Sequence, residues 1–408
     1  MNSIQLKDRL WWVGIEDFDL KVFDIIMTTE YGTSYNSYIL KGSEKTALFE
    51  TEKSKFFDEY LARIEEVAPL ADIDYIIMNH TEPDHADGIG LLLEKNPEIT
   101  VVGTAAAVNN LKQIINRTDF KAKTVRDKET LSLGDITLEF HALPNLHWPD
   151  TMWTYAKEIK TLFPCDSFGA HFATEEVLRS KVTDEEGYWK AAKYYYDCIM
   201  GPFSRPFVRN GLLRLKDLDV DMICTGHGPV LDSHIDEIIA KTDEWSAARP
   251  FARPTVVIPY VTAYGYTEMI AKAIAEGLVE SADGNMDVLL HNMQEDDPAV
   301  VIDEINRADG VLFGSPTIVG EALPPIFNLT TGLHAALVKG KHAAAFGSFG
   351  WSGEAVPHLT ERLKQLNMKV HDGLRIRFKP SGADLREAKA YGEYFGHLVR
   401  GTVSDSAE

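Results

Sequence analysis

Residues 78–88, MNHTEPDHADG, limit what this chain can fold into more than any other segment does. They place two histidines, one glutamate and two aspartates within eight positions. The apolar run IDYIIMN leads into the segment and predicts a buried strand that ends at Asn79. Unpaired buried charges are costly, so such a cluster is either exposed to solvent or held together by a cation. The density of titratable groups favours the cation, because the alternative requires several independent coincidences.

Four candidate ligands follow this strand: His80, Glu82, Asp84 and His85. His80 and Glu82 are two residues apart, so their side chains point the same way if the segment is extended. Asp84 and His85 then enter a helix that we expect to begin near Ala86. Open α/β sheets carry their functional groups at the carboxyl ends of their strands, which is where these residues fall.

Three further candidates occur downstream in similar contexts. His147 lies in the loop NLHWPD, Asp166 follows the apolar run TLFPC, and His227 lies in CTGHGP after DVDMIC. Each has an ordinary alternative, because an Asp before a helix is often an N-cap and a loop His is often solvated or locally hydrogen-bonded. Since all seven residues follow strands or connect them, we expect them to converge at one sheet edge.

Seven ligands are too many for one four-coordinate ion and suit a pair of metal ions that share a bridging group. Glu82, Asp84 and Asp166 supply three negative charges. Two divalent cations carry four positive charges, so about one positive charge is left for a bridging hydroxide to neutralise. Zinc favours nitrogen and sulfur ligands, whereas a carboxylate-rich set suits iron or manganese better. Zinc nevertheless stays an alternative at this point.

Composition narrows the class of protein. A length of 408 residues predicts two or three domains, and the net charge of −21 argues against nucleic acid and anionic membranes as partners. The three cysteines form no CxxC pair, which argues against a disulfide framework and an iron–sulfur module. The sequence contains no run of 18 apolar residues, and the first residues do not resemble a secretory signal. We therefore expect a cytoplasmic protein.

Two regions differ in their pattern. Residues 1–249 mix short strands, including the expected strands 22–29, 33–42 and 45–51, with helices that cover a sheet-rich domain. Proline and small residues around EWSAARPFARPT indicate a linker. Residues 254–402 repeat strand, glycine-containing loop and helix, which predicts a doubly wound parallel sheet.

Three loops of the second region form a candidate flavin site. TAYGYT, residues 262–267, joins a buried strand to a helix, whose N-terminus suits an anion. The loop lacks the two further glycines of a dinucleotide fingerprint, which favours a monophosphate such as FMN over NAD. Taken alone, this loop is equally well explained as an ordinary strand-to-helix turn. Trp351 either stacks on the flavin ring or is an ordinary packing residue. The candidate flavin-binding residues are Thr262, Ala263, Tyr264, Gly265, Tyr266, Thr267, Ser315, Pro316, Thr317, Ser348, Phe349, Gly350, Trp351, Ser352 and Gly353.

The segment HTEPDHADG resembles the HxExDH signature of flavodiiron proteins (A-type flavoproteins), the redox branch of the metallo-β-lactamase fold. The hydrolase branch has HxHxDH, with histidine where this chain has Glu82. HWPDTMWTY, GTSYNSYIL and the three flavin loops are also similar to the family, so the resemblance extends from about residue 5 to residue 400. It implies a metallo-β-lactamase-like αββα sandwich over 1–249 and a flavodoxin-like domain over 254–402. One departure is Tyr264, where flavodoxins commonly have Ser or Thr, which leaves the phosphate contact there open.

The resemblance also implies a chemistry. His80, Glu82 and His147 are expected on one iron, Asp84, His85 and His227 on the other, and Asp166 between the two. The expected reaction is reduction of dioxygen to water, or of nitric oxide to nitrous oxide, with electrons passed through FMN. The expected donor is reduced coenzyme F-420, as for the F-420 oxidase type of the family, or a rubredoxin-like protein. The expected assembly is a homodimer or a dimer of dimers.

Alternatives to this interpretation are a zinc hydrolase with a flavodoxin regulatory domain and a non-catalytic electron carrier. Glu82 argues against the first, and seven intact candidate ligands argue against the second. The tyrosines Tyr194–Tyr196 and the histidine His171 resemble family segments near the metals, and helix packing or a locally bonded histidine explains them equally well.

Overall fold

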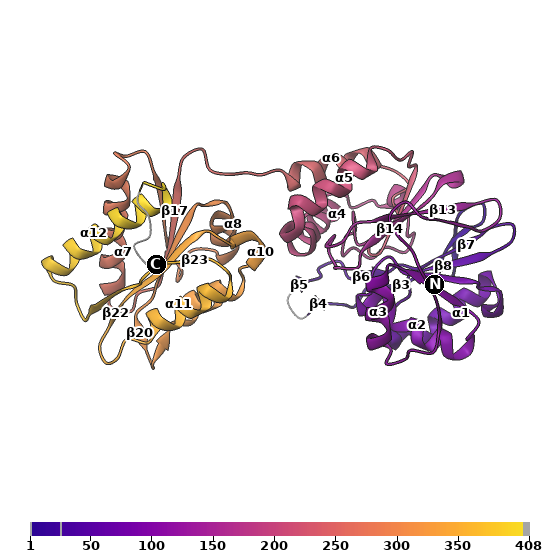
Figure 1. The fold of residues 1–408 in the computed structure, drawn as a ribbon, viewed down its shortest axis with the longest axis horizontal. Helices are drawn as coiled ribbons and strands as arrows, with labels where there is room; N and C mark the ends of the chain where they lie inside the picture. Colours follow the sequence, from indigo (N-terminus) through magenta and orange to yellow (C-terminus); the bar gives the residue numbers. More distant parts are fainter. Residues whose placement is uncertain (1, 25–26, 403–408) are drawn as a thin grey trace. The chain divides into compact units, whose positions relative to one another are not determined.

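The chain folds as two units, Met1–Ala247 and Ala248–Glu408. The computed structural model describes residues 2–24 and 27–402 (Figure 1). Each unit has its own sheets and its own buried cores.

A seven-stranded sheet forms the first layer of strands in unit 1. Its members are short runs rich in β-branched and aromatic residues, such as TALF and YII, which favour extended backbone. β8, β9, β10 and β11 are parallel to one another, while β1, β2 and β7 pair antiparallel. In spatial order the strands are β1 (Ile4–Lys7), β2 (Leu10–Trp12), β7 (Tyr38–Lys41), β8 (Thr46–Phe49), β9 (Tyr75–Ile77), β10 (Thr100–Gly103) and β11 (Lys121–Thr124).

A five-stranded sheet forms the second layer. Its first four strands pair antiparallel and the last pair is parallel. A buried core that includes Phe49, Phe140 and Phe163 fills the space between the two sheets. The strands are, in spatial order, β12 (Thr130–Ser132), β13 (Thr137–Ala142), β14 (Met152–Ala156), β15 (Thr161–Cys165) and β16 (Met222–Thr225).

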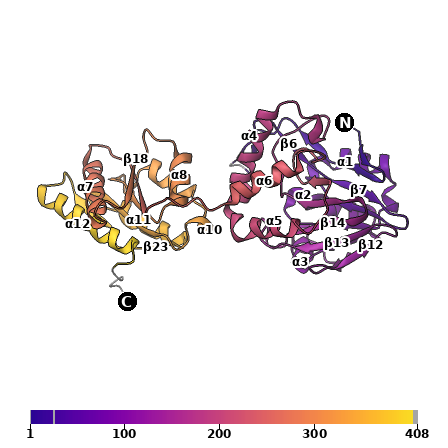
Figure 2. The same ribbon diagram turned by 90° about the horizontal axis from the view of Figure 1, so that it is seen from above.

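Helices cover the outer face of each sheet (Figures 1 and 2). One core joins the first three helices to the seven-stranded sheet, and another joins the last three to the five-stranded sheet. The helices are α1 (Phe57–Val67), α2 (Pro83–Lys95) and α3 (Ala105–Ile114) on the first side, and α4 (Glu185–Tyr195), α5 (Arg209–Leu215) and α6 (Ile235–Ser246) on the other. This is the predicted αββα sandwich.

Unit 2 is built on a parallel sheet of six strands in the order β18-β17-β19-β22, with β23 and β24 both pairing β22. Separate cores lie on its two faces, one with α7 and α12 and one with α8, α9 and α11. The strands are β17 (Thr255–Tyr260), β18 (Asp287–Asn292), β19 (Gly310–Gly314), β22 (His342–Phe349), β23 (Lys369–Val370) and β24 (Leu374–Arg377), and the helices are α7 (Tyr266–Ser281), α8 (Pro298–Arg307), α9 (Pro324–Thr331), α10 (Ala335–Val338), α11 (Ala355–Gln365) and α12 (Gly382–Val399). The predicted doubly wound sheet is confirmed.

Smaller elements complete the chain. Paired short strands are β3 (Ile15–Asp17) with β6 (Thr33–Tyr35), β4 (Val22–Phe23) with β5 (Met27–Thr28), and β20 (Thr317–Ile318) with β21 (Glu321–Ala322). Short 3-10 or π-helical segments are η1 (Ser54–Phe56), η2 (Leu70–Asp72), η3 (Lys157–Ile159), η4 (Arg179–Lys181), η5 (Tyr196–Met200), η6 (Gly201–Phe203) and η7 (Ser204–Val208).

Three local expectations were wrong. The single strand expected over 33–42 is divided into β6 and β7, which belong to different sheets. The single strand expected over 22–29 is a pair of two-residue strands, β4 and β5, and the intervening residues 25–26 lie outside the described part. The helix expected near Ala86 begins three residues earlier, at Pro83. Proline at the first helical position loses no hydrogen bond, because that N–H has no partner inside the helix.

Candidate metal centre and flavin pocket

The end of β9 and the start of α2 carry four of the seven candidate ligands. His80 lies in the loop between these elements, Glu82 is the N-cap residue of α2, and Asp84 and His85 lie on its first turn. The partial positive charge at a helix N-terminus stabilises carboxylates there. The early start of α2 therefore fixes three candidate ligands on one rigid element.

The five-stranded sheet supplies the other three. His147 lies in the loop between β13 and β14, Asp166 directly follows β15, and His227 follows β16. All seven were expected at one sheet edge. Instead they come from the ends of strands in both sheets of the sandwich, because the two layers face each other and their loops meet at one end.

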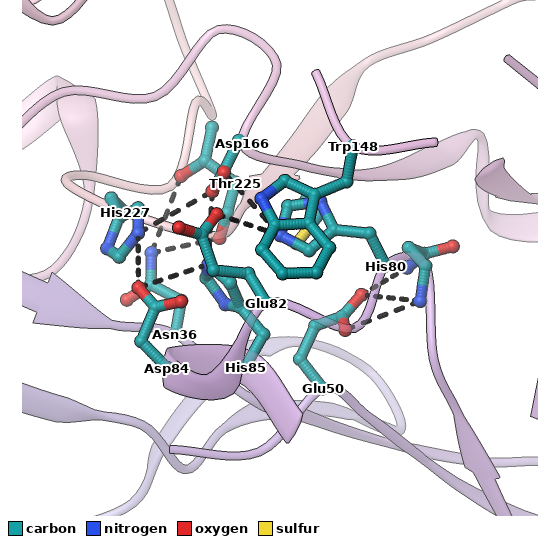
Figure 3. Close-up of polar contacts among 12 residues, drawn as sticks. Asn36, Glu50, His80, Glu82, Asp84, His85, Trp148, Asp166, Thr225 and His227 are labelled. Atoms are coloured by element: carbon teal, nitrogen blue, oxygen red, sulfur yellow. Dashed lines mark hydrogen bonds and ion pairs between the residues drawn. The ribbon is translucent and has the colours of Figure 1, made fainter. Parts of the chain in front are cut away.

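His80, Glu82 and His147 surround one oxygen of Asp166. Figure 3 shows His80, Glu82 and Asp166 of this group. The Nε2 atoms of His80 and His147 lie 3.5 and 2.9 Å from Asp166 Oδ2. Glu82 Oε2 lies 3.7 Å from His80 Nε2 and 3.1 Å from His147 Nε2. Four potential ligand atoms therefore converge on one point.

Asp84, His85 and His227 surround the other oxygen of the same carboxylate. His85 Nε2 is 3.1 Å and His227 Nε2 is 3.5 Å from Asp166 Oδ1. Asp84 Oδ2 is 3.5 Å from His85 Nε2 and 3.1 Å from His227 Nε2. Ligands about 2.1 Å from one ion are separated from each other by roughly 3.0–3.5 Å, which these spacings match.

Burial and missing partners show that these residues fit a pair of cations. Both carboxylate oxygens of Asp84, the Nε2 of His85 and the Oδ1 of Asp166 are buried and have no hydrogen-bond partner among the described residues. Buried polar atoms without partners are costly, so a set of them aimed at one place indicates a missing ion. The donor set of imidazoles and carboxylates suits iron.

The electrostatics agree with this fit. Burial disfavours charge on His85, but Asp84 and Asp166 outweigh it and raise the pKa of His85 to about 10. Burial likewise opposes the charge on His147, and hydrogen bonds to Asp166 and Glu82 raise its pKa to about 10. The carboxylates thus stabilise positive charge on the neighbouring histidines. Protons supply this charge in the metal-free protein, and metal ions that bind the histidines displace these protons.

The candidate flavin site is a pocket of about 620 Å³ in unit 2, a volume in the range of small-molecule sites. Eleven of the fifteen predicted residues line it, namely Thr262, Ala263, Tyr264, Tyr266, Pro316, Thr317, Ser348, Phe349, Gly350, Trp351 and Ser352. Trp351 is 92% and Tyr264 81% exposed. A large aromatic surface open to solvent beside a pocket fits stacking on a planar ligand.

The loop before α7 has the features of an anion site. Gly265 has a φ of +80° and caps the N-terminus of the helix. Thr262 Oγ1 is buried and has no hydrogen-bond partner among the described residues, while Thr267 Oγ1 and Ser348 Oγ are 3.1 Å apart. These groups can accommodate a phosphate at the end of the pocket.

Comparisons with known proteins match both units. The model of the ODP family beta lactamase matches residues 33–228, and the flavodoxin model matches residues 258–392. The chain is 42% identical over 404 residues to the flavo-diiron protein FprA2 of Clostridium acetobutylicum, covering 98% of this chain and 100% of the relative. This chain belongs to the flavodiiron protein family.

Further relatives support the assignment. The flavodiiron protein is 34% identical to the anaerobic nitric oxide reductase flavorubredoxin of Salmonella typhi, over 96% of this chain and 81% of that one. The crystal structure of the flavodiiron protein from Giardia intestinalis matches with a TM-score of 0.70 and 30% identity, covering 98% and 97% of the two chains. Rubredoxin oxygen:oxidoreductase from Desulfovibrio gigas matches with a TM-score of 0.73 and 27% identity, covering 98% and 99%.

Flavodiiron proteins are oxidoreductases that bind FMN through the flavodoxin domain and iron at a diiron centre. The predicted pair of cofactors is therefore confirmed for the family to which this chain belongs. Among the described residues, no helix combines the length and the apolar character that crossing a membrane requires.

Four predicted flavin residues do not line the pocket: Gly265, Thr267, Ser315 and Gly353. Ser315 Oγ instead accepts a hydrogen bond from the Leu323 N–H at 2.9 Å, so it stabilises its own loop. Five residues that line the pocket were not predicted from the sequence. Only one of them, Gly320, is of a residue type that indicates a turn. The five are Ile318, Val319, Gly320, Glu354 and Phe378.

Around the candidate metal ligands, sequence reasoning missed groups that hold these side chains in place. His227 Nδ1 donates to the backbone oxygen of Ser34 at 2.6 Å, which leaves its Nε2 free for a metal. Trp148 lies nearly parallel to His80, with ring centroids 6.0 Å apart (Figure 3). Cys165 Sγ is 3.7 Å from His80 Nε2, although no cysteine motif marked it.

Glu50 is another buried group that the sequence did not single out. Its carboxylate accepts hydrogen bonds from the backbone N–H and the side-chain amide of Asn79, at 3.1 and 2.6 Å (Figure 3). Burial raises the pKa of Glu50 to about 8, with His85 and Asn79 opposing the shift. This arrangement anchors the residue that directly precedes His80.

The structure distinguishes the three neighbouring tyrosines. Tyr195 is buried, and its ring packs edge-on against His171 and lies 6.0 Å from the ring of His227. Tyr194 is 42% exposed, and Tyr196 is bonded to a serine hydroxyl away from the ligands. His171 is held by Thr33 Oγ1, 2.8 Å from its Nδ1, and packs against His227.

Proposed function

We propose that this flavodiiron protein reduces dioxygen to water, nitric oxide to nitrous oxide, or both, at a diiron centre held by the seven residues described above. The single observation that carries the proposal is the position of Asp166, whose two carboxylate oxygens each face a separate group of two histidines and one carboxylate. Two metal ions sharing one carboxylate suit the binding of a diatomic molecule between them.

The cofactors supply redox chemistry when bound: the irons bind and polarise the gas, and FMN delivers electrons. The fold of this chain fixes the positions of the seven candidate ligands and limits their contact with water. His80, His85, Asp84 and Asp166 are at most 3% exposed, whereas the side chains of His147 and Glu82 are 12% and 15% exposed, so bulk water is excluded from all but one side of the site. Glu82, the N-cap of α2, occupies the place where the hydrolase branch has a histidine. Its carboxylate favours iron over zinc, because iron binds carboxylate ligands more readily than zinc does.

We infer that FMN is bound in the pocket of unit 2, with the flavin ring beside Trp351 and the phosphate near Thr262 and the N-terminus of α7. The exposed indole and the partnerless Thr262 hydroxyl support this assignment. A flavin carries up to two electrons, so it suits reactions that consume two electrons per nitric oxide pair and four per dioxygen.

Electrons are proposed to come from outside the chain, from reduced coenzyme F-420 or from a rubredoxin-like protein. The name of the Desulfovibrio gigas relative, rubredoxin oxygen:oxidoreductase, supports the second donor. We further propose a cytoplasmic homodimer or dimer of dimers, in which the FMN of one subunit serves the metals of its partner.

The test is parallel turnover of dioxygen and nitric oxide by the anaerobically purified protein, with each candidate donor supplied in turn. Gas consumption by the wild type, and its loss in His147→Ala, are the expected results. His147 contributes an imidazole to one metal only and is the most exposed of the four histidines, so the fold should tolerate this change. Ester hydrolysis by a protein containing two zinc ions, without gas consumption, would instead support the hydrolase alternative.

A further inference from the structure

A small cavity lies in unit 1 beside the candidate metal ligands. It is enclosed by β14, α4, α5, α6 and the turn that follows Asp166, and its lining includes Leu146, Trp153, Ala192 and Leu212. These side chains are at most 7% exposed. The cavity is therefore part of the interior, on the side of the five-stranded sheet that the last three helices cover.

The cavity is suited to an apolar guest. Its volume is about 20 Å³, above the roughly 10–15 Å³ that one water-sized molecule requires. A buried water needs two to four polar partners. The Tyr195 hydroxyl is buried without a hydrogen-bond partner among the described residues, but it is a single group, and the hydroxyls of Ser167 and Thr242 are engaged. Ser167 Oγ is 3.1 Å from the indole N–H of Trp153, and Thr242 Oγ1 donates to the Ile238 carbonyl at 2.7 Å.

Gly169 separates the cavity from the metal ligands. A Cβ atom at this position would lie 3.1 Å from the backbone oxygen of Asp166, 3.2 Å from that of His227 and 3.4 Å from the ring of Tyr195. Gly169 lines the cavity and contributes no side chain, so at this point the cavity borders the backbone of the two loops that carry these ligands. Tyr195 lines the cavity and packs against His171, which in turn contacts His227.

We propose that this cavity binds a small apolar diatomic gas, dioxygen or nitric oxide, next to the metal centre. The inference rests on the proposed function, because it gives the same substrates a binding site that they occupy before they reach the metal centre. Apolar cavities of this kind stay dry and take up uncharged gases, including xenon. A gas held at Gly169 is close to the ligands without occupying a ligand position, which raises its local concentration there.

The first test uses xenon as a probe on the full-length protein. Crystals pressurised with xenon should show anomalous scattering in the cavity of the wild type, and the peak should be lost in Ala192→Leu, which fills the space. Leu212→Met, which keeps the side-chain volume, should retain the peak. Val208→Ile is a milder filling variant in case Ala192→Leu fails to fold. A wild-type cavity without xenon would overturn the proposal.

The second test links the cavity to gas delivery. In the reduced, metal-loaded enzyme, Ala192→Leu should lower the second-order rate constant for dioxygen or nitric oxide by roughly 3- to 10-fold, with a change of less than about 2-fold in the rate at saturating gas. Equal rate constants in wild type and variant would overturn the role in delivery.

Xenon binding requires neither metal, flavin nor turnover, so the two proposals fail separately. Xenon in the cavity of a protein that consumes no gas would count against the proposed function alone. Gas consumption by a protein whose cavity takes up no xenon would count against the cavity alone.

Discussion

Among single residues, Asp166 matters most for the proposed two-metal site. Its carboxylate is buried and lies within 3.5 Å of four histidine Nε2 atoms, two on each oxygen. No other carboxylate in the described part of the site contacts both groups of ligands. A single side chain thus determines whether the site is one centre or two unrelated ones.

Asp166→Asn should lower the metal content from two ions per chain to one or none and reduce gas turnover. Loss of groups that merely orient ligands costs 10- to 100-fold, so loss of the shared ligand should cost at least about 100-fold in activity. Elemental analysis and gas electrodes measure the two effects. The control is Asp150→Asn, another buried carboxylate of unit 1, whose contact is with Thr81 Oγ1 at 2.7 Å. Full metal content in Asp166→Asn would contradict the bridging role.

A second prediction concerns His141, a buried residue on β13 that is not one of the candidate ligands. Burial, with the nearby Lys128, lowers its pKa to about 4, so the folded state holds the neutral ring. Its imidazole Nε2 is 3.4 Å from Glu139 Oε1, which offsets part of this effect. Because the unfolded residue titrates near 6.5, this stability is present above pH 6.5 and is lost as the pH falls towards 4.

His141→Gln should therefore flatten the acid dependence of stability. Between pH 7 and pH 5 the wild type should lose about 1 kcal/mol more than this variant, a figure reduced for screening by solvent. Denaturant unfolding of metal-free protein at the two pH values checks this, with the exposed His234→Gln as the control. An identical pH dependence of wild type and His141→Gln would refute the assignment.

At the scale of elements, α7 is expected to provide much of the FMN phosphate affinity. Gly265 must keep a φ of +80° so that the N-terminus of α7 faces the pocket, and an added Cβ would meet no atom within 4 Å. Only backbone strain of about 1–2 kcal/mol therefore opposes Gly265→Ala. We expect FMN affinity to fall by roughly 5- to 30-fold.

Fluorescence titration of the flavin-free protein with FMN measures this affinity. The control, Gly382→Ala, places a methyl group at the start of α12, where the nearest atom is the guanidinium of Arg386 at 3.7 Å and no positive φ is required. Unchanged FMN affinity in Gly265→Ala would show that the phosphate is bound elsewhere.

The elements also show how far the sequence could be interpreted. Apolar runs such as IDYIIMN correctly marked strands, because burial in a central sheet leaves a local signature. The run over 22–29 is similarly apolar, but its described residues form two short antiparallel strands, β4 and β5. The preference of proline for the first helical turn would have predicted the start of α2 at Pro83, but the expected start was Ala86. Local pattern does not reveal which strands pair.

The candidate site was predictable where ligands cluster in sequence and less so elsewhere. His80 to His85 form a dense motif, and all seven predicted ligands do converge. That they come from two sheets was not predictable, since sheet membership depends on long-range pairing. Trp148 and Cys165 contact His80 through the same tertiary pairing, and neither has a local signal for this role.

At the scale of the whole molecule, the proposed exchange of electrons between subunits can be tested by complementation. Asp166→Asn should lack a complete pair of metal ions and keep FMN, whereas Gly265→Asp should keep both metal ions and lose FMN by repelling the phosphate. Neither variant alone should reduce gas. In a statistical mixture of co-expressed chains, half the dimers are mixed and each has one working site, which restores about a quarter of wild-type activity.

Turnover by the co-expressed pair, compared with each variant expressed alone, checks this prediction. If electrons pass from FMN to metal only within one chain, the mixture will be as inactive as its components. Restored activity that depends on co-expression supports the assembly in which each subunit completes its partner.

The central claim is that this chain holds two iron ions on one shared carboxylate, together with one flavin. The most direct measurement is elemental and flavin analysis of the wild-type protein purified without oxygen. The account predicts two irons and one FMN per chain. Two zinc ions per chain, or a single metal ion that added iron does not increase, would contradict it.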